Sequence, residues 1–382
     1  MNVMILTVSS GEGHNAMGKA LMTELQSRGY NSKLVDYYKE ADPLRQWFVQ
    51  DFYFWTLRNF PRISHRSYVT VQQRDFKKQP SRFSVFSMML KSKKSIQNVI
   101  QQLKDFQPDI IYCTHVYTAT LMCELRRQGK TNAKIFFMVS DYVVHPYTEL
   151  TTDIDYLLTP NHDFDKELMS MGFRQDQLLP FGITVNPKFS NHQSKEFARE
   201  ALGLQPNLPT FMIMNGGVGF GNSLRLVKEL SKVELPFQLV IVNGRNEKMK
   251  KKIDDFIQKH KIENVLNYGF ATNVDQIMDA SDALIGKIGG VAITEAFNKG
   301  LTIIVPTIPP FQEYSNMVYL TARDAIIYAG SEAKTAEVVQ SLLVTPGRID
   351  ELQKNVAALR RPNATKDFAD FLVNQYGKEL NH

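Results

Sequence analysis

The chain opens on short apolar runs that alternate with longer segments of mixed polarity. Residues 2–8 are mostly apolar, and apolar residues recur at helical spacing from residue 17 to residue 28, just before Gly29. A short apolar run is typical of a strand buried in a parallel sheet, and a spacing of three and four is typical of a helix. Residues 33–35 form the next apolar run, so the sequence begins with a predicted strand–helix–strand unit.

The alternation continues in two sets, which predict two Rossmann-like domains. The first set predicts strands at residues 109–113, 134–139 and 156–159, with helices at 95–106 and 118–128. The second predicts strands at 210–214, 237–242, 265–266, 283–285 and 302–306, with helices that end at 232 and span 248–259, 274–280, 291–298, 349–360 and 366–376. This order indicates an α/β protein whose two domains face each other across a cleft, with ligands at the carboxyl ends of the strands.

The length of 382 residues also favours two domains. Residues 181–187 are extended in pattern and are interpreted as the connection between them. We predict an N-terminal domain at residues 1–185, a C-terminal domain at 186–345, and C-terminal helices at 346–382 that pack back towards the N-terminal domain. Residues 43–94 interrupt the first alternation and are interpreted as an insertion.

The composition is that of an ordinary globular protein, with 43% hydrophobic residues. The presence of only two cysteines, Cys113 and Cys123, argues against a disulfide framework and fits a reducing cytosol. Residues 1–8 are too short and lack the basic start of a signal peptide, and no apolar run reaches the ~20 residues of a membrane-spanning helix. The expectation is a soluble or peripheral protein.

Residues 43–94 carry a concentrated positive charge. They hold 11 lysines and arginines against Asp51 and Asp75, a net charge of +9, whereas the whole chain carries +6. Both tryptophans lie on a stripe of large apolar residues at helical spacing, and each Lys or Arg near an anionic bilayer contributes ~1 kcal/mol. The predicted membrane-binding residues are Trp47, Phe48, Phe52, Trp55, Arg58, Arg62, Arg66, Lys77, Lys78 and Arg82.

Two other interpretations of this segment remain. An aromatic stripe at such spacing is also typical of a helix packed in a core. A basic patch also suits nucleic acid, but the sequence carries no recognisable nucleic-acid-binding module, so we expect no nucleic acid partner. With an anionic membrane surface as the partner, the predicted location is peripheral, on the cytoplasmic face of the cell membrane.

The strongest local signal for ligand chemistry lies at residues 283–298. The apolar run Ala283-Leu284-Ile285 leads through Gly289-Gly290 into a predicted helix that ends before Gly300. A strand, a glycine pair and a helix start present free backbone N–H groups to an anion, and glycine lets a phosphate approach closely. Glu295, one turn into the helix, is placed to accept hydrogen bonds from sugar hydroxyls. This stretch is interpreted as the donor site of a nucleotide-sugar enzyme.

The first glycine loop admits a different interpretation. Residues 11–16 match G-x-G-x-x-A, and Asp36 follows at the end of the next predicted strand. This is the dinucleotide-binding fingerprint, which predicts NAD binding. The elements at residues 289–295 and 312–316 have no place in a typical dehydrogenase, and they favour the nucleotide-sugar interpretation.

Short motifs follow one another in a set order along almost the whole chain. They are Ser10-Gly11-Glu12-Gly13-His14-Asn15, Val139-Ser140-Asp141 with His145-Pro146, Asn243-Gly244-Arg245-Asn246, Gly269-Phe270, Ala280-Ser281-Asp282, Gly289-Gly290 with Thr294-Glu295-Ala296, and Gln312-Glu313 with Asn316. Their order and spacing resemble the GT-B glycosyltransferases, and most closely the monogalactosyldiacylglycerol synthase and processive diacylglycerol glucosyltransferase family. The peptidoglycan lipid-intermediate N-acetylglucosaminyltransferases are more distantly similar.

The resemblance implies a UDP-sugar site in the C-terminal domain. The diphosphate would lie on the N–H groups of residues 289–291 with help from the glycine loop at 216–219, the uracil near Arg245 and Phe270, the ribose on Glu295, and the hexose hydroxyls on Gln312 and Glu313. The donor-binding residues expected from it are Gly217, Gly219, Arg245, Phe270, Gly289, Gly290, Val291, Thr294, Glu295, Gln312, Glu313 and Asn316.

The catalytic residues expected from the resemblance are His14 and Asp141. His14 is implied as the general base or as the group that orients the acceptor, and a histidine with an ordinary pKa of about 6.5 suits that role near neutral pH. Asp141 is the other acidic candidate. The histidines are scattered and neither cysteine belongs to a CxxC pair, so the sequence predicts no metal site and no cofactor. The family implies inversion, which gives a β-linked product from an α-linked donor.

The predicted function is therefore a membrane-associated inverting glycosyltransferase. It would move a hexose, with glucose as the expected sugar, from a UDP-sugar to diacylglycerol. A polyprenyl-linked acceptor and a non-catalytic UDP-sugar-binding regulator are the alternatives. The chain departs from the family at Gly286-Lys287-Ile288-Gly289-Gly290, where members often have Thr-Lys-Pro-Gly-Gly, and it has no tryptophan after His145-Pro146.

Overall fold

The computed structural model describes residues 1–9, 12–38, 92–214, 222–309 and 312–377. All ten predicted membrane-binding residues, from Trp47 to Arg82, lie outside the described residues, and so do Gly217 and Gly219. The predictions for these residues therefore remain predictions from the sequence.

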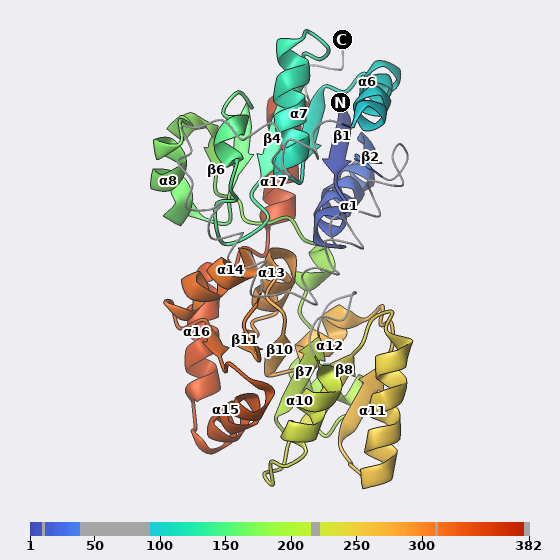
Figure 1. The fold of residues 1–382 in the computed structure, drawn as a ribbon, viewed down its shortest axis with the longest axis vertical. Coiled ribbons are helices and arrows are strands. Elements are labelled where there is room, and N and C mark those ends of the chain that lie inside the picture. The colour runs from blue at the N-terminus through green and yellow to red at the C-terminus, as the bar shows by residue number, and fades with distance from the viewer. Residues whose placement is uncertain (10–11, 39–91, 215–221, 310–311, 378–382) are drawn as a thin grey trace. The chain divides into compact units, whose positions relative to one another are not determined.

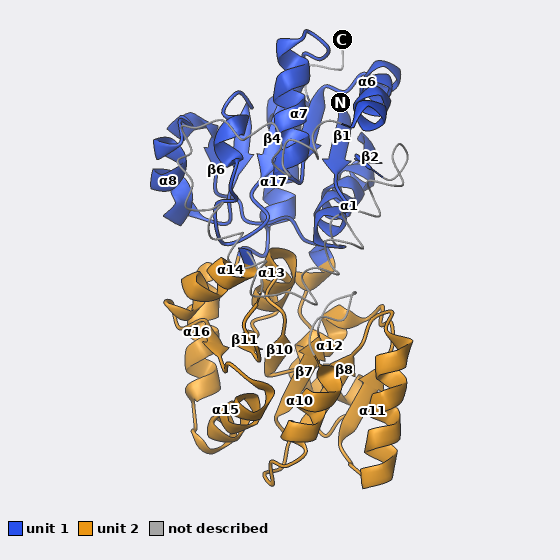
Figure 2. Ribbon diagram, viewed as in Figure 1, with its two compact units in different colours: residues 1–187, 310–312, 361–382 blue, residues 188–309, 313–360 orange. Residues whose placement is uncertain are grey.

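The chain divides into two compact units, coloured separately in Figure 2. Unit 1 comprises residues 1–187, 310–312 and 361–382, and unit 2 comprises residues 188–309 and 313–360. The predicted C-terminal segment at 346–382 is divided between them. Its first helix, α16 (Arg348–Leu359), belongs to unit 2, and its second, α17 (Ala364–Tyr376), belongs to unit 1.

Unit 1 is built on a six-stranded parallel sheet with the strand order β2-β1-β3-β4-β5-β6. Along the chain the strands are β1 (Asn2–Thr7), β2 (Asn31–Asp36), β3 (Ile110–Cys113), β4 (Lys134–Met138), β5 (Tyr156–Leu158) and β6 (Leu178–Leu179). The central strands β1 and β3 are buried almost throughout, as expected of a parallel sheet covered on both faces. Ile5 of β1 lies opposite Leu34 on one side and Tyr112 on the other.

The helices of unit 1 cover this sheet (Figure 1). They are α1 (Glu12–Ser27), α6 (Lys93–Phe106), α7 (Val116–Arg127), α8 (Asp165–Ser170) and α17. Although α17 is the last helix of the chain, it contributes to this core. The ring of Phe368 lies with its centroid 5.3 Å from that of Tyr112 and 5.5 Å from that of Phe136. Aromatic pairs at such distances contribute to packing beyond their buried area.

Unit 2 is built on a second six-stranded parallel sheet, with the order β12-β11-β10-β7-β8-β9. The strands are β7 (Thr210–Met214), β8 (Gln238–Val242), β9 (Val265–Tyr268), β10 (Ala283–Gly286), β11 (Thr302–Val305) and β12 (Ile326–Tyr328). Ile285 of the central strand β10 lies opposite Ile213 of β7 and Ile304 of β11, and all three are fully buried. The sequence pattern predicts β7 to β11 as strands, whereas β12 is not among the predicted strands.

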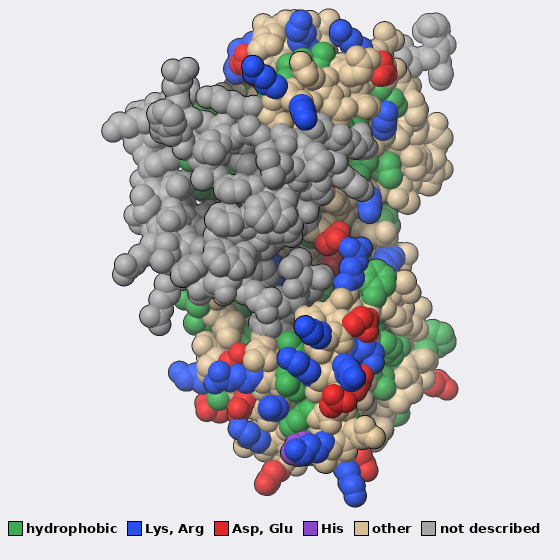
Figure 3. All heavy atoms as spheres, turned by 45° about the vertical axis from the view of Figure 1, so that its right-hand side comes forward, with side chains coloured by type: hydrophobic (Ala, Val, Ile, Leu, Met, Phe, Trp, Pro, Cys, Tyr) green, Lys and Arg blue, Asp and Glu red, His purple; other side chains and the backbone are tan. Residues whose placement is uncertain are grey.

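The helices of unit 2 lie around its sheet. They are α9 (Lys195–Ala201), α10 (Ser223–Leu230), α11 (Glu247–His260), α12 (Val274–Ala280), α13 (Gly290–Asn298), α14 (Gln312–Thr321), α15 (Glu332–Val344) and α16. In the view of Figure 3, lysine and arginine side chains on the described surface are interspersed with aspartate and glutamate. Exposed pairs of this kind, such as Lys250 with Asp254, contribute little to stability.

Two Rossmann-like units, each with a parallel sheet, confirm the predicted fold class. The cleft between the units stays a prediction. Among the helices that the structure describes, none combines the length and the apolar character needed to cross a bilayer.

Candidate active site

The predicted base, His14, lies in the first turn of α1, directly after the loop that follows β1. Its Nδ1 is 2.6 Å from the carbonyl oxygen of Thr114, at the end of the neighbouring strand β3. Since a carbonyl oxygen only accepts, Nδ1 carries the proton in the neutral ring and Nε2 keeps its lone pair. The loop is held by further contacts, because Asn15 accepts from the Thr7 hydroxyl at 2.9 Å and donates to the Ser9 hydroxyl at 3.2 Å.

Two further histidines, which are not among the predicted site residues, lie beside His14. The His115 ring lies with its centroid 4.7 Å from that of His14, at an interplanar angle of 68°. The His145 ring lies 5.9 Å from that of His115. The three side chains follow β1, β3 and β4, which are neighbours in the sheet. Their meeting depends on strand order, which no local pattern in the sequence reveals.

The structure brings the second predicted catalytic residue, Asp141, to the same pocket. His14, His115, His145, Ser140 and Asp141 all line it. Asp141 accepts a hydrogen bond of 3.2 Å from the Ser140 hydroxyl. The described part of the chain contains no group of three or more His, Cys, Asp or Glu side chains arranged to hold a metal ion.

All three histidines are kept neutral near pH 7. Burial lowers the pKa of His14 to about 4, although its bond to the Thr114 carbonyl opposes the shift. The pKa of His115 is also lowered, mainly by burial and to a smaller extent by the nearby His14 and His145. Burial lowers the pKa of His145 as well. The physical cause is that a partly dry pocket disfavours the charged imidazolium. His14 can therefore accept a proton through Nε2.

In unit 2, the predicted phosphate-binding turn joins β10 to α13. A Cβ built on Gly286 would lie 2.1 Å from the carbonyl oxygen of Met214, so the close pairing of β10 with β7 requires glycine there. Gly289 is the N-cap of α13 and supplies no side-chain acceptor to the first turn. The N-terminus of a helix is a position where backbone N–H groups can bind an anion, and the sequence predicts such a site at residues 289–291.

Helix α14 fixes this turn from the side. Asn316, which is fully buried, donates from Nδ2 to the carbonyl oxygen of Ile288 at 3.1 Å. Glu313 accepts from Lys287, with Nζ 2.7 Å from Oε1. The same Oε1 would lie 3.7 Å from a Cβ on Gly289, so the carboxylate stands beside the turn. Two residues that the sequence assigns to the donor therefore contact the loop itself, and Lys287 is an addition to the predicted site.

The first turns of α13 carry Thr294 and Glu295. Thr294 is buried and its hydroxyl donates to the carbonyl oxygen of Gly290 at 2.8 Å, within the helix. Glu295 is partly buried, and burial raises its pKa to about 8, against the opposing effect of Lys188. A carboxyl group with such a pKa is mostly protonated at neutral pH in the protein without ligand.

Two of the remaining described donor candidates, Arg245 and Phe270, lie at the same edge of the unit 2 sheet. Arg245 is in the turn after β8, and Phe270 follows β9, which pairs with β8. Phe270 is 67% exposed, which is unusual for a side chain of its size and leaves its ring available for stacking. Gln312, the first residue of α14, belongs instead to unit 1 and lines the pocket of the three histidines. Since all strands of unit 2 are parallel, Arg245, Phe270 and the turn after β10 share the carboxyl edge of its sheet.

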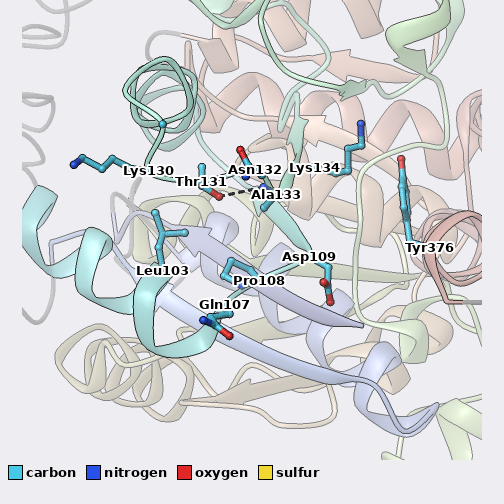
Figure 4. Close-up of a pocket in the computed structure, with 11 residues that line it drawn as sticks. Leu103, Gln107, Pro108, Asp109, Lys130, Thr131, Asn132, Ala133, Lys134 and Tyr376 are labelled. Atoms are coloured by element: carbon cyan, nitrogen blue, oxygen red, sulfur yellow. Dashed lines mark hydrogen bonds between the residues drawn. The ribbon is translucent and has the colours of Figure 1, made fainter. Parts of the chain in front are cut away.

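A second pocket of unit 1 lies at the opposite edge of the sheet. Figure 4 shows it between the end of α6, at Leu103 and Gln107, the segment from Lys130 to Lys134 that leads into β4, and Tyr376 at the end of α17. These residues precede β3 and β4, whereas the histidines follow β1, β3 and β4. The pocket is therefore separate from the histidine site and contains none of the predicted site residues.

Comparison with known families finds a separate match for each half of the chain. Residues 14–185 match the family described as monogalactosyldiacylglycerol (MGDG) synthase, and residues 211–371 match the glycosyltransferase family 28 C-terminal domain. The chain is similar to the monogalactosyldiacylglycerol synthase family in its N-terminal part and to glycosyltransferase family 28 in its C-terminal part. The predicted resemblance is thereby confirmed, and the protein is an enzyme that transfers sugars.

Curated relatives match this glycosyltransferase from end to end. A processive diacylglycerol beta-glucosyltransferase from Bacillus licheniformis is 25% identical over 377 residues, which cover 98% of this chain and 95% of that protein. The protein of the same name from Bacillus subtilis is 25% identical over 379 residues, with coverage of 98% and 95%.

Solved structures show the same fold at low sequence identity. UDP-GlcNAc 2-epimerase from Neisseria meningitidis, bound to UDP-GlcNAc, has a TM-score of 0.62 at 17% identity and covers 98% of this chain and 100% of its own. MurG from Acinetobacter baumannii has a TM-score of 0.60 at 14% identity, with coverage of 98% and 99%. At these identities the likeness concerns the fold alone.

Proposed function

We propose that this glycosyltransferase moves glucose from UDP-glucose to diacylglycerol, with inversion at the anomeric carbon. The observation that carries the proposal is His14, a neutral histidine whose Nε2 keeps its lone pair in a pocket shared with Asp141. The names of the relatives, which match along nearly the whole chain, support diacylglycerol as the acceptor and glucose as the sugar.

The proposed reaction divides the work between the units. In unit 2, the N–H groups at the start of α13 bind the diphosphate and stabilise the charge that develops as UDP leaves. In unit 1, His14 takes the proton from the acceptor hydroxyl as its oxygen attacks the anomeric carbon. The oxygen–carbon bond forms as the bond to UDP breaks, so a single displacement inverts the configuration. Asp141 serves as the second candidate for proton transfer.

The membrane is the proposed location because the acceptor is a lipid. Support comes from the sequence of residues 43–94, with its charge of +9 and both tryptophans. In this proposal the enzyme adsorbs to the cytoplasmic face of an anionic membrane and takes diacylglycerol from it.

The test gives the purified enzyme one donor and one acceptor at a time, in separate reactions. UDP-glucose or UDP-galactose is mixed with vesicles that contain diacylglycerol or a polyprenyl-linked sugar, and the lipids are analysed by mass spectrometry. Monoglucosyl diacylglycerol is the expected product. A glycosylated polyprenyl lipid would establish the alternative acceptor, and UDP-glucose binding by calorimetry without any lipid product would favour a regulator. The K77Q/K78Q/R82Q variant should sediment less with anionic vesicles, in a salt-sensitive way.

A further inference from the structure

His14 is contacted twice by one dipeptide at the end of β3. The carbonyl oxygen of Thr114 binds its Nδ1 at 2.6 Å, and the adjacent His115 places its ring against the His14 ring at a centroid distance of 4.7 Å. The first contact favours one tautomer of His14. The second limits rotation of its ring, because an edge-to-face neighbour occupies the space into which the ring would turn.

His115 is itself held rigidly. It is the N-cap of α7, and its Nδ1 accepts a hydrogen bond of 3.1 Å from the backbone N–H of Tyr117. Its ring also contacts the Tyr117 ring, with a centroid distance of 4.4 Å. Since Nδ1 accepts a bond, the neutral ring carries its proton on Nε2. The basic nitrogen of His115 is therefore already used by the helix, and His115 is poorly suited to act as a base.

The groups around the cluster keep both rings neutral. His115 faces His14, His145 and Tyr117, and Asp141 lines the same pocket. Burial lowers the pKa of both His14 and His115, and the neighbouring His14 and His145 lower that of His115 further. Both rings are therefore neutral near pH 7, and the hydrogen bond made by each Nδ1 is what distinguishes them.

We propose that His115 is a positioning residue for the base, and that its ring holds the imidazole of His14 with Nδ1 on the Thr114 carbonyl and Nε2 available to the acceptor. The inference rests on the proposed function for the catalytic role of His14. The positioning itself is a property of unit 1 alone. His115 would then have two roles. It caps α7, and it also holds the ring of His14 in place.

Two substitutions separate the ring from the cap. H115N keeps a side chain that caps helices well but removes the ring, whereas H115F keeps a ring of similar size but removes the cap. Misplacing a catalytic group by about 1 Å costs up to about 100-fold, so H115N is expected to lower kcat by about 10- to 100-fold, with the KM for UDP-glucose unchanged. H115F should keep kcat within about threefold of the native enzyme while lowering Tm through loss of the cap.

A matched control is H162N, which changes an exposed histidine of the same unit that pairs with Asp165. It should leave kcat unchanged. If His115 served only as a cap, the order of the two kcat values would reverse, so that H115N would be active and H115F impaired. That reversal, or native kcat in both variants, would overturn the proposal.

A second measurement does not depend on any activity. Imidazole ¹⁵N spectra of the histidine-labelled protein report the tautomer of His14 directly. A single Nδ1–H form is expected in the native protein and in H115F, and a mixture of tautomers in H115N. A single tautomer in H115N would contradict the positioning role. The expected spectra without any glycolipid product would leave that role standing and refute the proposed function instead.

Discussion

Asn316 donates a hydrogen bond of 3.1 Å from its side-chain amide to the carbonyl oxygen of Ile288, two residues before the N-terminus of α13 begins. The bond is fully buried and joins α14 to the turn that the sequence assigns to the diphosphate. A phosphate-binding turn must hold its N–H groups in a set direction before the ligand arrives. We interpret Asn316 as the residue that keeps this turn in place.

The first prediction concerns this bond. N316A leaves the Ile288 carbonyl buried without its partner, which costs about 1–3 kcal/mol, so the KM for UDP-glucose should rise about tenfold or more. N355A is the control, because Asn355 makes a comparable bond of 3.0 Å to the Asp324 carbonyl elsewhere in unit 2. It should lower Tm by a similar amount and leave the KM unchanged. Equal effects of both variants on KM would argue against a specific role for Asn316.

The second prediction concerns the ion pair beside the same turn. Glu313 Oε2 is buried and accepts no hydrogen bond from the described residues, so Lys287 is what balances this carboxylate. Removing the lysine in K287M leaves an unbalanced negative charge beside the diphosphate site. UDP binding should weaken about 10- to 100-fold, as buried charge pairs are costly to break on one side only.

Calorimetry with UDP measures this effect, and a double-mutant cycle locates it. K287M/E313Q removes both charges and should recover part of the lost affinity. K250M breaks the exposed pair with Asp254 on α11 and should bind UDP as the native enzyme does. Additive losses in the double variant would show that the two residues act independently.

The third prediction is a pH dependence set by His14. Its pKa is lowered to about 4, so the ring is neutral and able to accept a proton above that pH. kcat/KM for UDP-glucose should stay level from pH 7 down to about pH 5 and fall as the pH approaches 4. H14Q should lower kcat by about 100- to 10,000-fold with UDP binding nearly intact, as measured by steady-state kinetics and calorimetry. Loss of UDP binding in H14Q would contradict the assignment of His14 to the acceptor.

The fourth prediction concerns Glu295, whose pKa is raised to about 8 by burial. The carboxyl group ionises as the pH rises through that value, and an ionised carboxylate accepts stronger hydrogen bonds from the ribose hydroxyls. The KM for UDP-glucose should therefore fall between pH 7 and pH 9 in the native enzyme and stay level in E295Q. E295A should raise this KM at pH 7 and by a larger factor, about tenfold, at pH 9, where the native carboxylate is ionised. A native pH profile in E295Q would show that another group titrates.

The glycine turn and its flanking elements could be predicted because their signals are local. The apolar run that becomes β10, the glycine pair, and the helix α12 before them (Val274–Ala280, predicted at the same bounds) all follow from adjacent residues. Helix α14 was not predicted. Only Asn316, Met317 and Leu320 of its residues are buried, so it lacks the apolar face that marks a helix in sequence.

The histidine cluster lies beyond what a local pattern can reveal. His14, His115 and His145 are far apart in the chain and meet because β1, β3 and β4 are neighbours in the sheet. The ion pair of Lys287 with Glu313 likewise depends on how α14 packs against the turn. From the sequence, His14 is expected at the carboxyl edge of the first sheet and Glu313 at that of the second. The residues that contact them are determined by tertiary packing.

The central claim is an inverting transfer of glucose to diacylglycerol, and the anomeric configuration of the product tests it most directly. The purified enzyme is incubated with UDP-glucose and vesicles that contain diacylglycerol, and the glycolipid is isolated and examined by proton NMR. A β-glucosyl diacylglycerol is the predicted result, because single displacement inverts the α-linked donor. An α-linked product, or no glucosylated diacylglycerol at all, would contradict the account.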